Sequence, residues 1–263
     1  MSAVDFYQVM LIDTHCHIYL DEFDSDREDM LSRARNEGVS KFIMPAIDSE
    51  THVDLLALAD KYPASCLPMM GLHPCSVKAE FEKELKIAEA YFDKRTFIAV
   101  GETGLDFYWD LTWKKEQYIS FQRQIEWAIH YNLPVVIHSR NSLDECIKII
   151  SENQKGYLKG VFHCFSGTPE QASKIIHLGF YLGIGGVVTF KNSGIDKVIK
   201  NVDLKHIVLE TDSPYLAPVP VRGKRNECSY LKYVVERLSS IKGVSKEEIG
   251  LITTGNAKEL FGI

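Results

Sequence analysis

Residues Val9–His17 read VMLIDTHCH, a short apolar run that passes directly into a His-x-His pair. Apolar runs of this length are typical of the buried strands of parallel sheets. Side chains alternate along a strand, so His15 and His17 are expected to point the same way, just beyond the last apolar residue. The pattern therefore predicts a buried strand whose carboxyl end presents two imidazoles to one point.

The same kind of apolar run recurs along the chain, and each run is followed by a stretch with helical spacing. The predicted strands are Val9–Asp13, Lys41–Ala46, Ser65–Gly71, Phe97–Gly101, Pro134–Ile137, Gly160–His163, Tyr181–Ile184 and Ile207–Glu210. Eight strand–helix units without a linker between them favour a closed barrel. We therefore predict an α/β fold, a single TIM-like (β/α)8 barrel domain over residues 1–263, with an open doubly wound sheet as the alternative.

The intervening helices show their ends in the sequence. They are predicted at Asp26–Glu37, Ser49–Lys61, Phe81–Asp93, Trp113–Tyr131, Leu143–Glu152, Pro169–Leu178, Gly194–Lys200 and Cys228–Ser240. Ser49 and Thr168 stand where hydroxyl side chains commonly cap a helix amino terminus. Gly38 and Gly179 stand where glycine commonly ends one.

Composition describes an ordinary globular protein. The chain has 263 residues, 45% hydrophobic and 25% charged, and 30 basic against 36 acidic residues give a net charge of −6. A polyanion would therefore have to be held by a local basic patch. The six cysteines are scattered and form no CxxC pair, and the sequence shows no signal-peptide or membrane-span features. We therefore expect a cytoplasmic protein that does not associate with a membrane. We expect a monomer, since no obligate protein partner is evident.

Ionisable residues stand at the carboxyl ends of five predicted strands. They are His15 and His17, Glu102, His138, His163 and Asp212. A single histidine after an apolar run is more often structural than a ligand. Several such groups meeting at the mouth of one barrel, however, would repel or stay unpaired without a cation. The set therefore predicts a metal centre.

The number of candidate ligands indicates two metal ions. Six exceed the three or four of one tetrahedral zinc, and a carboxylate can bridge two ions about 3.5–4 Å apart in a hydrolytic site. Imidazole ligands favour zinc, manganese or iron, while the carboxylates keep magnesium possible.

Seven segments together resemble the signature motifs of the TatD family of metal-dependent deoxyribonucleases. They are IDTHCH at 12–17, GLHP at 71–74, GETGLD at 101–106, IHSR at 137–140, FHCFSG at 162–167, LETDSPYL at 209–216 and NA at 256–257. The family belongs to the amidohydrolase superfamily, whose fold is a distorted (β/α)8 barrel. The resemblance implies one ion bound by His15, His17, Glu102 and Asp212, and a second bound by Glu102, His138 and His163. Asn141 and Cys228 depart from the family pattern, which has an acidic residue and a proline there.

Two carboxylates are the candidate catalytic residues. Glu102 would bridge the ions, and Asp212 would orient the attacking water and take its proton, with a role as ligand only as the alternative. Glu210 shares a strand face with Asp212 and is expected either to contact substrate or to form a structural ion pair.

Further residues are candidates for substrate contact. His73 is expected to bind the scissile phosphate or to be structural, and Arg140 to clamp a phosphate. Arg222 and Arg225 lie in a basic loop that would grip the phosphate backbone. Tyr108 and Trp109 are expected to stack a base or to pack in the core.

These features lead us to expect a hydrolase of DNA phosphodiester bonds, of the 3′–5′ exonuclease type, with DNA as substrate. The alternative is a hydrolase of amide or ester bonds, such as a D-aminoacyl-tRNA deacylase, because the same metal chemistry serves carbonyl substrates. A third possibility is a barrel that binds metal without catalysis.

Overall fold

The structure is a computed structural model that describes residues 10–263. Its strands are β1 (Leu11–Asp13), β2 (Val39–Met44), β3 (Cys66–Pro68), β4 (Val100–Asp106), β5 (Val135–Arg140), β6 (Gly160–Phe162), β7 (Tyr181–Ile184) and β8 (Ile207–Leu209). Every pairing between them is parallel. Each of the eight predicted strands is thus present, although Val9, the first residue predicted for β1, lies outside the described residues.

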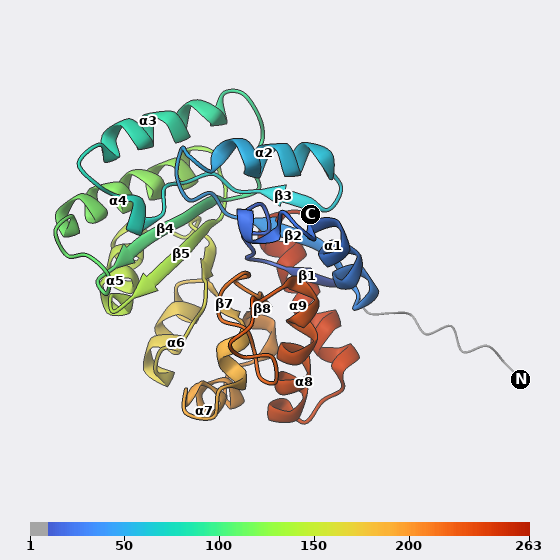
Figure 1. The fold of residues 1–263 in the computed structure, drawn as a ribbon. Helices are drawn as coiled ribbons and strands as arrows, with labels where there is room; N and C mark the ends of the chain where they lie inside the picture. Colours follow the sequence, from blue (N-terminus) through green and yellow to red (C-terminus); the bar gives the residue numbers. More distant parts are fainter. Residues whose placement is uncertain (1–9) are drawn as a thin grey trace, which may run out of the picture.

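The strands form two sheets that meet at both edges. One has the order β1-β2-β3 and the other the order β4-β5-β6-β7-β8. Between β3 and β4, Gly101 N donates to Met70 O at 2.9 Å, and between β8 and β1, Thr14 N donates to Leu209 O at 2.9 Å. Isolated parallel bridges, Met70 to Val100 and Cys16 to Ser213, lie at the same two junctions. The eight strands therefore form the TIM-like barrel that the sequence predicts (Figure 1).

Helices surround this ring of strands in Figure 1. They are α1 (Arg27–Asn36), α2 (His52–Lys61), α3 (Phe81–Phe92), α4 (Lys114–His130), α5 (Leu143–Asn153), α6 (Pro169–His177), α7 (Ile195–Lys200), α8 (Leu231–Lys242) and α9 (Lys246–Phe261). Within residues 10–263, no helix combines the length and the apolar character that crossing a bilayer requires.

Among the α-helices of residues 10–263, α9 is the one that the sequence pattern did not predict. Its buried face mixes apolar residues with Thr253, Thr254 and Asn256, so it shows no clean apolar stripe. The end of the helix carries Leu260 and Phe261, which pack with an apolar cluster contributed by the strands. Asn256 Nδ2 donates to the carbonyls of Leu204 and Ile207, at 2.7 Å each, just ahead of β8 and at its first residue. The helix therefore covers the amino-terminal end of the barrel.

Of the four residues predicted to cap or end a helix, three are confirmed. Thr168 caps α6 in a capping box with Gln171, and Gly38 and Gly179 have the positive φ angles, 87° and 80°, that glycine supplies after a helix. The prediction for Ser49 was wrong. Helix α2 begins after Thr51, and the amide and hydroxyl of Ser49 instead donate to the Glu84 carboxylate at 2.9 and 2.8 Å.

Replacing Thr168 with alanine should destabilise the protein by about 1 kcal/mol, because the amide of Gln171 loses its cap. Urea unfolding followed by circular dichroism measures the change. Thr168→Ser keeps the hydroxyl and should unfold at close to the wild-type urea concentration. Equal losses in the two variants would show that the side-chain cap is not the cause.

Candidate metal centre

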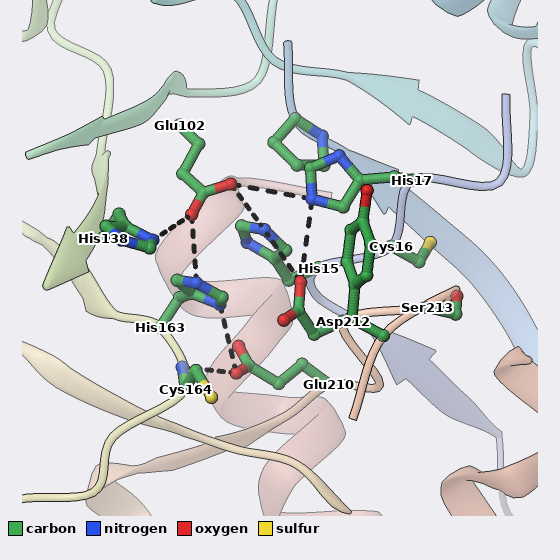
Figure 2. A network of polar contacts seen from close by, with 12 residues as sticks. His15, Cys16, His17, Glu102, His138, His163, Cys164, Glu210, Asp212 and Ser213 are labelled. Atoms are coloured by element: carbon green, nitrogen blue, oxygen red, sulfur yellow. Dashed lines mark hydrogen bonds and ion pairs between the residues drawn. The ribbon is translucent and has the colours of Figure 1, made fainter. Parts of the chain in front are cut away.

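The six predicted ligand residues meet near the carboxyl ends of the strands, although Glu102 is the third residue of β4 because that strand runs from Val100 to Asp106. His15 and His17 follow β1, Glu102 lies in β4, His138 lies in β5, His163 follows β6 and Asp212 follows β8. Figure 2 shows their polar atoms directed toward one another around the Glu102 carboxylate. The two histidines after β1, Glu102 and His163 are buried, whereas the side chains of His138 and Asp212 are 16% and 15% exposed. The group is thus largely buried, and His138 and Asp212 are the members that solvent reaches.

The two oxygens of Glu102 divide the histidines into two sets. Oε2 lies 3.1 Å from Nε2 of His15 and 3.6 Å from Nε2 of His17. Oε1 lies 3.0 Å from Nδ1 of His138 and 3.0 Å from Nε2 of His163. Asp212 joins the first set, with Oδ1 at 3.8 and 3.6 Å from the nitrogens of His15 and His17. One carboxylate therefore stands between two groups of donor atoms.

These distances suit divalent cations. Two ligands about 2.1 Å from a tetrahedral zinc lie about 3.4 Å apart, close to the spacings measured around Glu102. The candidate metal-binding groups around Glu102 and Asp212 have ligand atoms within 4.8 Å of one another. Imidazole nitrogens with carboxylate oxygens are donors that first-row transition ions prefer. The residues present therefore fit divalent metal ions.

The electrostatics of the pocket keep Glu102 ionised. Burial acts to raise its pKa, but the imidazoles of His15, His163 and His73 outweigh burial and hold the pKa well below its ordinary value. Burial likewise acts to lower the pKa of His163, but the carboxylates of Glu102 and Glu210 raise it well above the ordinary value. Glu102 and His163 therefore each favour the charged form of the other.

An outer layer of polar side chains orients the histidines. Tyr19 Oη donates to Pro45 O at 2.7 Å and lies 3.2 Å from His17 Nδ1, so its oxygen can accept the proton of that nitrogen. Asp106 Oδ2 lies 2.9 Å from His138 Nε2. In each case the other ring nitrogen is directed at Glu102, which is how outer residues commonly fix the tautomer of a metal-binding histidine.

Sequence reasoning assigned no role to Tyr19 or Asp106. Asp106 lies four residues after Glu102 in β4, and both side chains lie on one strand face at period two, which was the available signal. Tyr19 carried no such signal, because it lies in the loop beyond the strand.

Glu210 is buried beneath His163, as Figure 2 shows. Its Oε1 lies 3.3 Å from His163 Nδ1 and accepts a hydrogen bond from the amide of Cys164. Of the two expectations for this residue, the geometry favours the ion pair within the protein.

His73 joins the centre from the loop after β3. Its Nδ1 accepts a hydrogen bond from the amide of Cys75 at 3.0 Å, and its Nε2 lies 3.5 Å from Glu102 Oε1. A neutral imidazole that accepts at Nδ1 carries its proton on Nε2. In that tautomer His73 donates from Nε2 toward the Glu102 carboxylate, and the residue also belongs to a candidate metal-binding group with Glu102 and His138.

Arg140, Tyr108 and Trp109 lie together at the rim of the barrel mouth. The Arg140 guanidinium carbon is 3.8 Å from the centre of the Tyr108 ring and 5.1 Å from that of Trp109. Tyr108 is 53% exposed and Trp109 is 69% exposed. Core packing, one of the two expectations for these aromatics, is therefore contradicted.

The two arginines of the basic loop have different surroundings. Arg222 is exposed, with its guanidinium carbon 4.3 Å from the centre of the Phe190 ring. Arg225 donates two hydrogen bonds to Asp26, at 2.7 and 2.9 Å, and a third to the carbonyl of Glu22. The charge of Arg225 is thus engaged within the protein, while that of Arg222 faces solvent.

Comparisons with known proteins find relatives along nearly the whole described length of the chain. A family model described as TatD related DNase matches residues 12–262. The uncharacterized metal-dependent hydrolase YabD of Bacillus subtilis is 37% identical over 255 residues, which cover 97% of this chain and 100% of that protein. Human deoxyribonuclease TATDN3 is 32% identical over 267 residues, covering 96% and 95% of the two chains. The crystal structure of YjjV, a TatD homologue from Escherichia coli K12, is 31% identical with a TM-score of 0.91, covering 97% of this chain and 99% of that one.

The ion pairs around Arg225 should make stability depend on pH. Hydrogen bonds from Arg225 and then Arg33, opposed by burial, hold the pKa of Asp26 well below its ordinary value of 3.8. A depressed carboxyl pKa stabilises the folded state above the unfolded-state pKa, and this contribution is lost as the pH falls through the folded-state pKa. Asp26→Asn should therefore lower the free energy of unfolding by about 1 kcal/mol at pH 7 and by progressively less below about pH 4.

Urea unfolding between pH 3 and pH 8 checks this prediction. Asp24→Asn is the matched control, since Asp24 pairs with Arg27 at 2.6 Å but its side chain is 63% exposed. This variant should lower the free energy of unfolding by less than Asp26→Asn does. A deficit for Asp26→Asn that stays constant down to pH 3 would contradict the electrostatic origin.

Proposed function

The chain belongs to the family of TatD-related DNases, metal-dependent hydrolases that act on ester bonds, and on that premise we propose that it is a deoxyribonuclease of the 3′–5′ exonuclease type. The observation that carries the proposal is the division of the histidines between the two oxygens of Glu102. A carboxylate between two ligand sets is the arrangement of two-metal sites that hydrolyse phosphate esters. The deoxyribonuclease name of the human relative supports DNA as the substrate.

We infer the metal ligands from the same division. One ion would be held by His15, His17, Asp212 and Glu102 Oε2, and the other by Glu102 Oε1, His138 and His163. Two divalent ions such as zinc, manganese or magnesium, when bound, lower the pKa of water and polarise a phosphoryl oxygen.

Asp212 would accept the proton of the attacking water. Burial acts to raise its pKa, but His17, His163 and His15 outweigh it, so the pKa is lowered and the carboxylate stays ionised at neutral pH. Its φ of 56° lies in the left-handed region, which aspartate tolerates better than most residues, and the side chain remains 15% exposed. An ionised carboxylate that is partly exposed can contact a water molecule from solvent.

The remaining candidates would act on the substrate. The Nε2–H of His73 can donate to an oxygen of the scissile phosphate. Arg140 and Arg222 are exposed on the rim, where guanidinium groups can hold the phosphates on either side.

Replacing Glu102 with glutamine should reduce metal-dependent cleavage of DNA to background, because the amide cannot bridge two cations. The assay follows release of nucleotides from end-labelled single- and double-stranded DNA with magnesium, manganese or zinc, beside a metal analysis of each protein. Glu152→Gln, on the exposed side of α5, is the matched control and should keep full activity.

Each result of this assay bears on a separate part of the proposal. Nucleotides released one at a time from the 3′ end would support the exonuclease assignment. A wild-type protein that holds about two ions per chain yet leaves both DNA forms intact would overturn the DNA assignment and leave the metal centre standing.

His73→Ala should lower kcat by about 10²- to 10³-fold, because the pocket loses a hydrogen-bond donor, while the bound metal content stays at the wild-type level. His73→Gln places an amide donor near the position of Nε2 and should recover part of the loss. Steady-state kinetics and metal analysis of the two variants check this. Loss of one metal equivalent in His73→Ala would instead make His73 a ligand.

A further inference from the structure

The loop after β4 presents aromatic rings to solvent beside the metal centre. Tyr108, Trp109 and Leu111 are all more than half exposed. The loop follows the carboxyl end of the strand that carries Glu102, so it lies at the rim of the barrel mouth. Large apolar side chains grouped at a functional surface commonly mark a binding site.

This loop is fixed relative to the candidate ligands by one carboxylate. Asp106 Oδ1 accepts hydrogen bonds from the amides of Tyr108, at 2.9 Å, and Trp109, at 3.2 Å. Its other oxygen lies 2.9 Å from His138 Nε2, and His138 Nδ1 lies 3.0 Å from Glu102. A short chain of hydrogen bonds therefore sets the position of the two rings relative to the metal centre.

The surroundings of the two rings indicate what they bind. Arg140 covers one side of Tyr108, and the rings of Tyr108 and Trp109 meet edge to face, with centroids 4.9 Å apart and planes at 87°. The indole has the Arg140 guanidinium carbon 5.1 Å from its ring centre, but at 69% exposure most of its surface remains open to solvent. Within residues 10–263 the Arg140 guanidinium contacts these two rings and forms no ion pair with a carboxylate, so its charge is available to an anion. A flat apolar face next to an unpaired cation matches a nucleobase attached to a phosphate.

We propose that Trp109 and Tyr108, with Arg140, form a base-stacking subsite for a nucleotide next to the scissile phosphate. The nucleobase stacks on the indole, and the guanidinium holds the adjoining phosphate. The inference rests on the proposed function, because it concerns the substrate of the same metal centre. It states that a base of that substrate, not paired with another strand, lies at the rim.

A set of chromogenic substrates tests the subsite. Thymidine 5′- and 3′-(p-nitrophenyl phosphate) carry a base on one side or the other of the cleaved ester, and methyl p-nitrophenyl phosphate has the same leaving group without a base. Trp109→Ala should lower kcat/KM about tenfold for at least one thymidine ester and leave the methyl ester unchanged. Trp109→Phe keeps an aromatic face and should recover most of the loss. Tyr157→Ala removes a tyrosine of similar exposure, 51%, from the loop before β6 at the other end of the barrel, and should change neither substrate.

A binding measurement separates this inference from the proposed function. A thymidylate tetramer with phosphorothioate linkages, which resist cleavage, should quench the fluorescence of the wild-type protein more than that of Trp109→Phe. If the wild type cleaves neither these esters nor end-labelled DNA, the proposed function fails, and a quench that depends on Trp109 still supports the subsite. An equal loss of kcat/KM on the methyl and thymidine esters would overturn the subsite, and so would the absence of a quench that depends on Trp109. An oligomer that forms in the wild type and is lost in Trp109→Ala would also overturn it.

Discussion

One buried carboxylate governs the organisation of this protein. Five histidines, His15, His17, His73, His138 and His163, have a ring nitrogen within 3.6 Å of an oxygen of Glu102. An isolated carboxylate in such a pocket costs several kcal/mol to bury, so it depends on the groups around it. The carboxyl ends of parallel barrel strands can supply those groups because they meet around a single mouth. The need to pair the buried Glu102 carboxylate therefore links the barrel fold to the candidate site.

The backbone has to approach the ligands closely for this arrangement to hold. A Cβ on Gly104, whose φ is +136°, would lie 2.0 Å from the carbonyl oxygen of His138, and a Cβ on Gly183 would lie 2.4 Å from Glu210 Oε2. Only glycine leaves room for β4 to pair with β5 next to His138, and for Glu210 to lie beneath His163. Outer residues such as Tyr19 and Asp106 then orient the imidazoles, so the geometry of the centre rests on two layers of side chains.

The two ends of the barrel have opposite chemistry. Leu260 and Phe261 of α9 pack with apolar strand residues at one end, where burial of apolar surface stabilises the fold. The charged groups gather at the other end, where they oppose burial unless they are paired. Asp26 and Arg225 tie the loop after β8 to the start of α1, so the loops around the mouth are also held by ion pairs. Stability and candidate chemistry are thus supplied by different parts of the same strands.

The amino-acid sequence by itself determined the strand–helix alternation, the eight strands and the polar residues at their ends, because periodicity and residue type are local properties. It also indicated Thr168, Gly38 and Gly179 as helix boundaries, whose effect depends only on adjacent backbone. It did not predict α9, whose buried face is too polar to show a stripe, and it misplaced the start of α2 because Ser49 pairs with the distant Glu84.

Tertiary structure alone decided which atoms face one another. The sorting of histidines between the oxygens of Glu102, the role of Tyr19 behind His17 and the engagement of Arg225 by Asp26 all join residues far apart in the chain or separated by a turn. Such pairings depend on where the strands end in space and on which rotamer each side chain adopts. The positions of the strand ends and the side-chain rotamers cannot be predicted from the spacing of residues. Both are set by packing between elements that come together only when the chain folds.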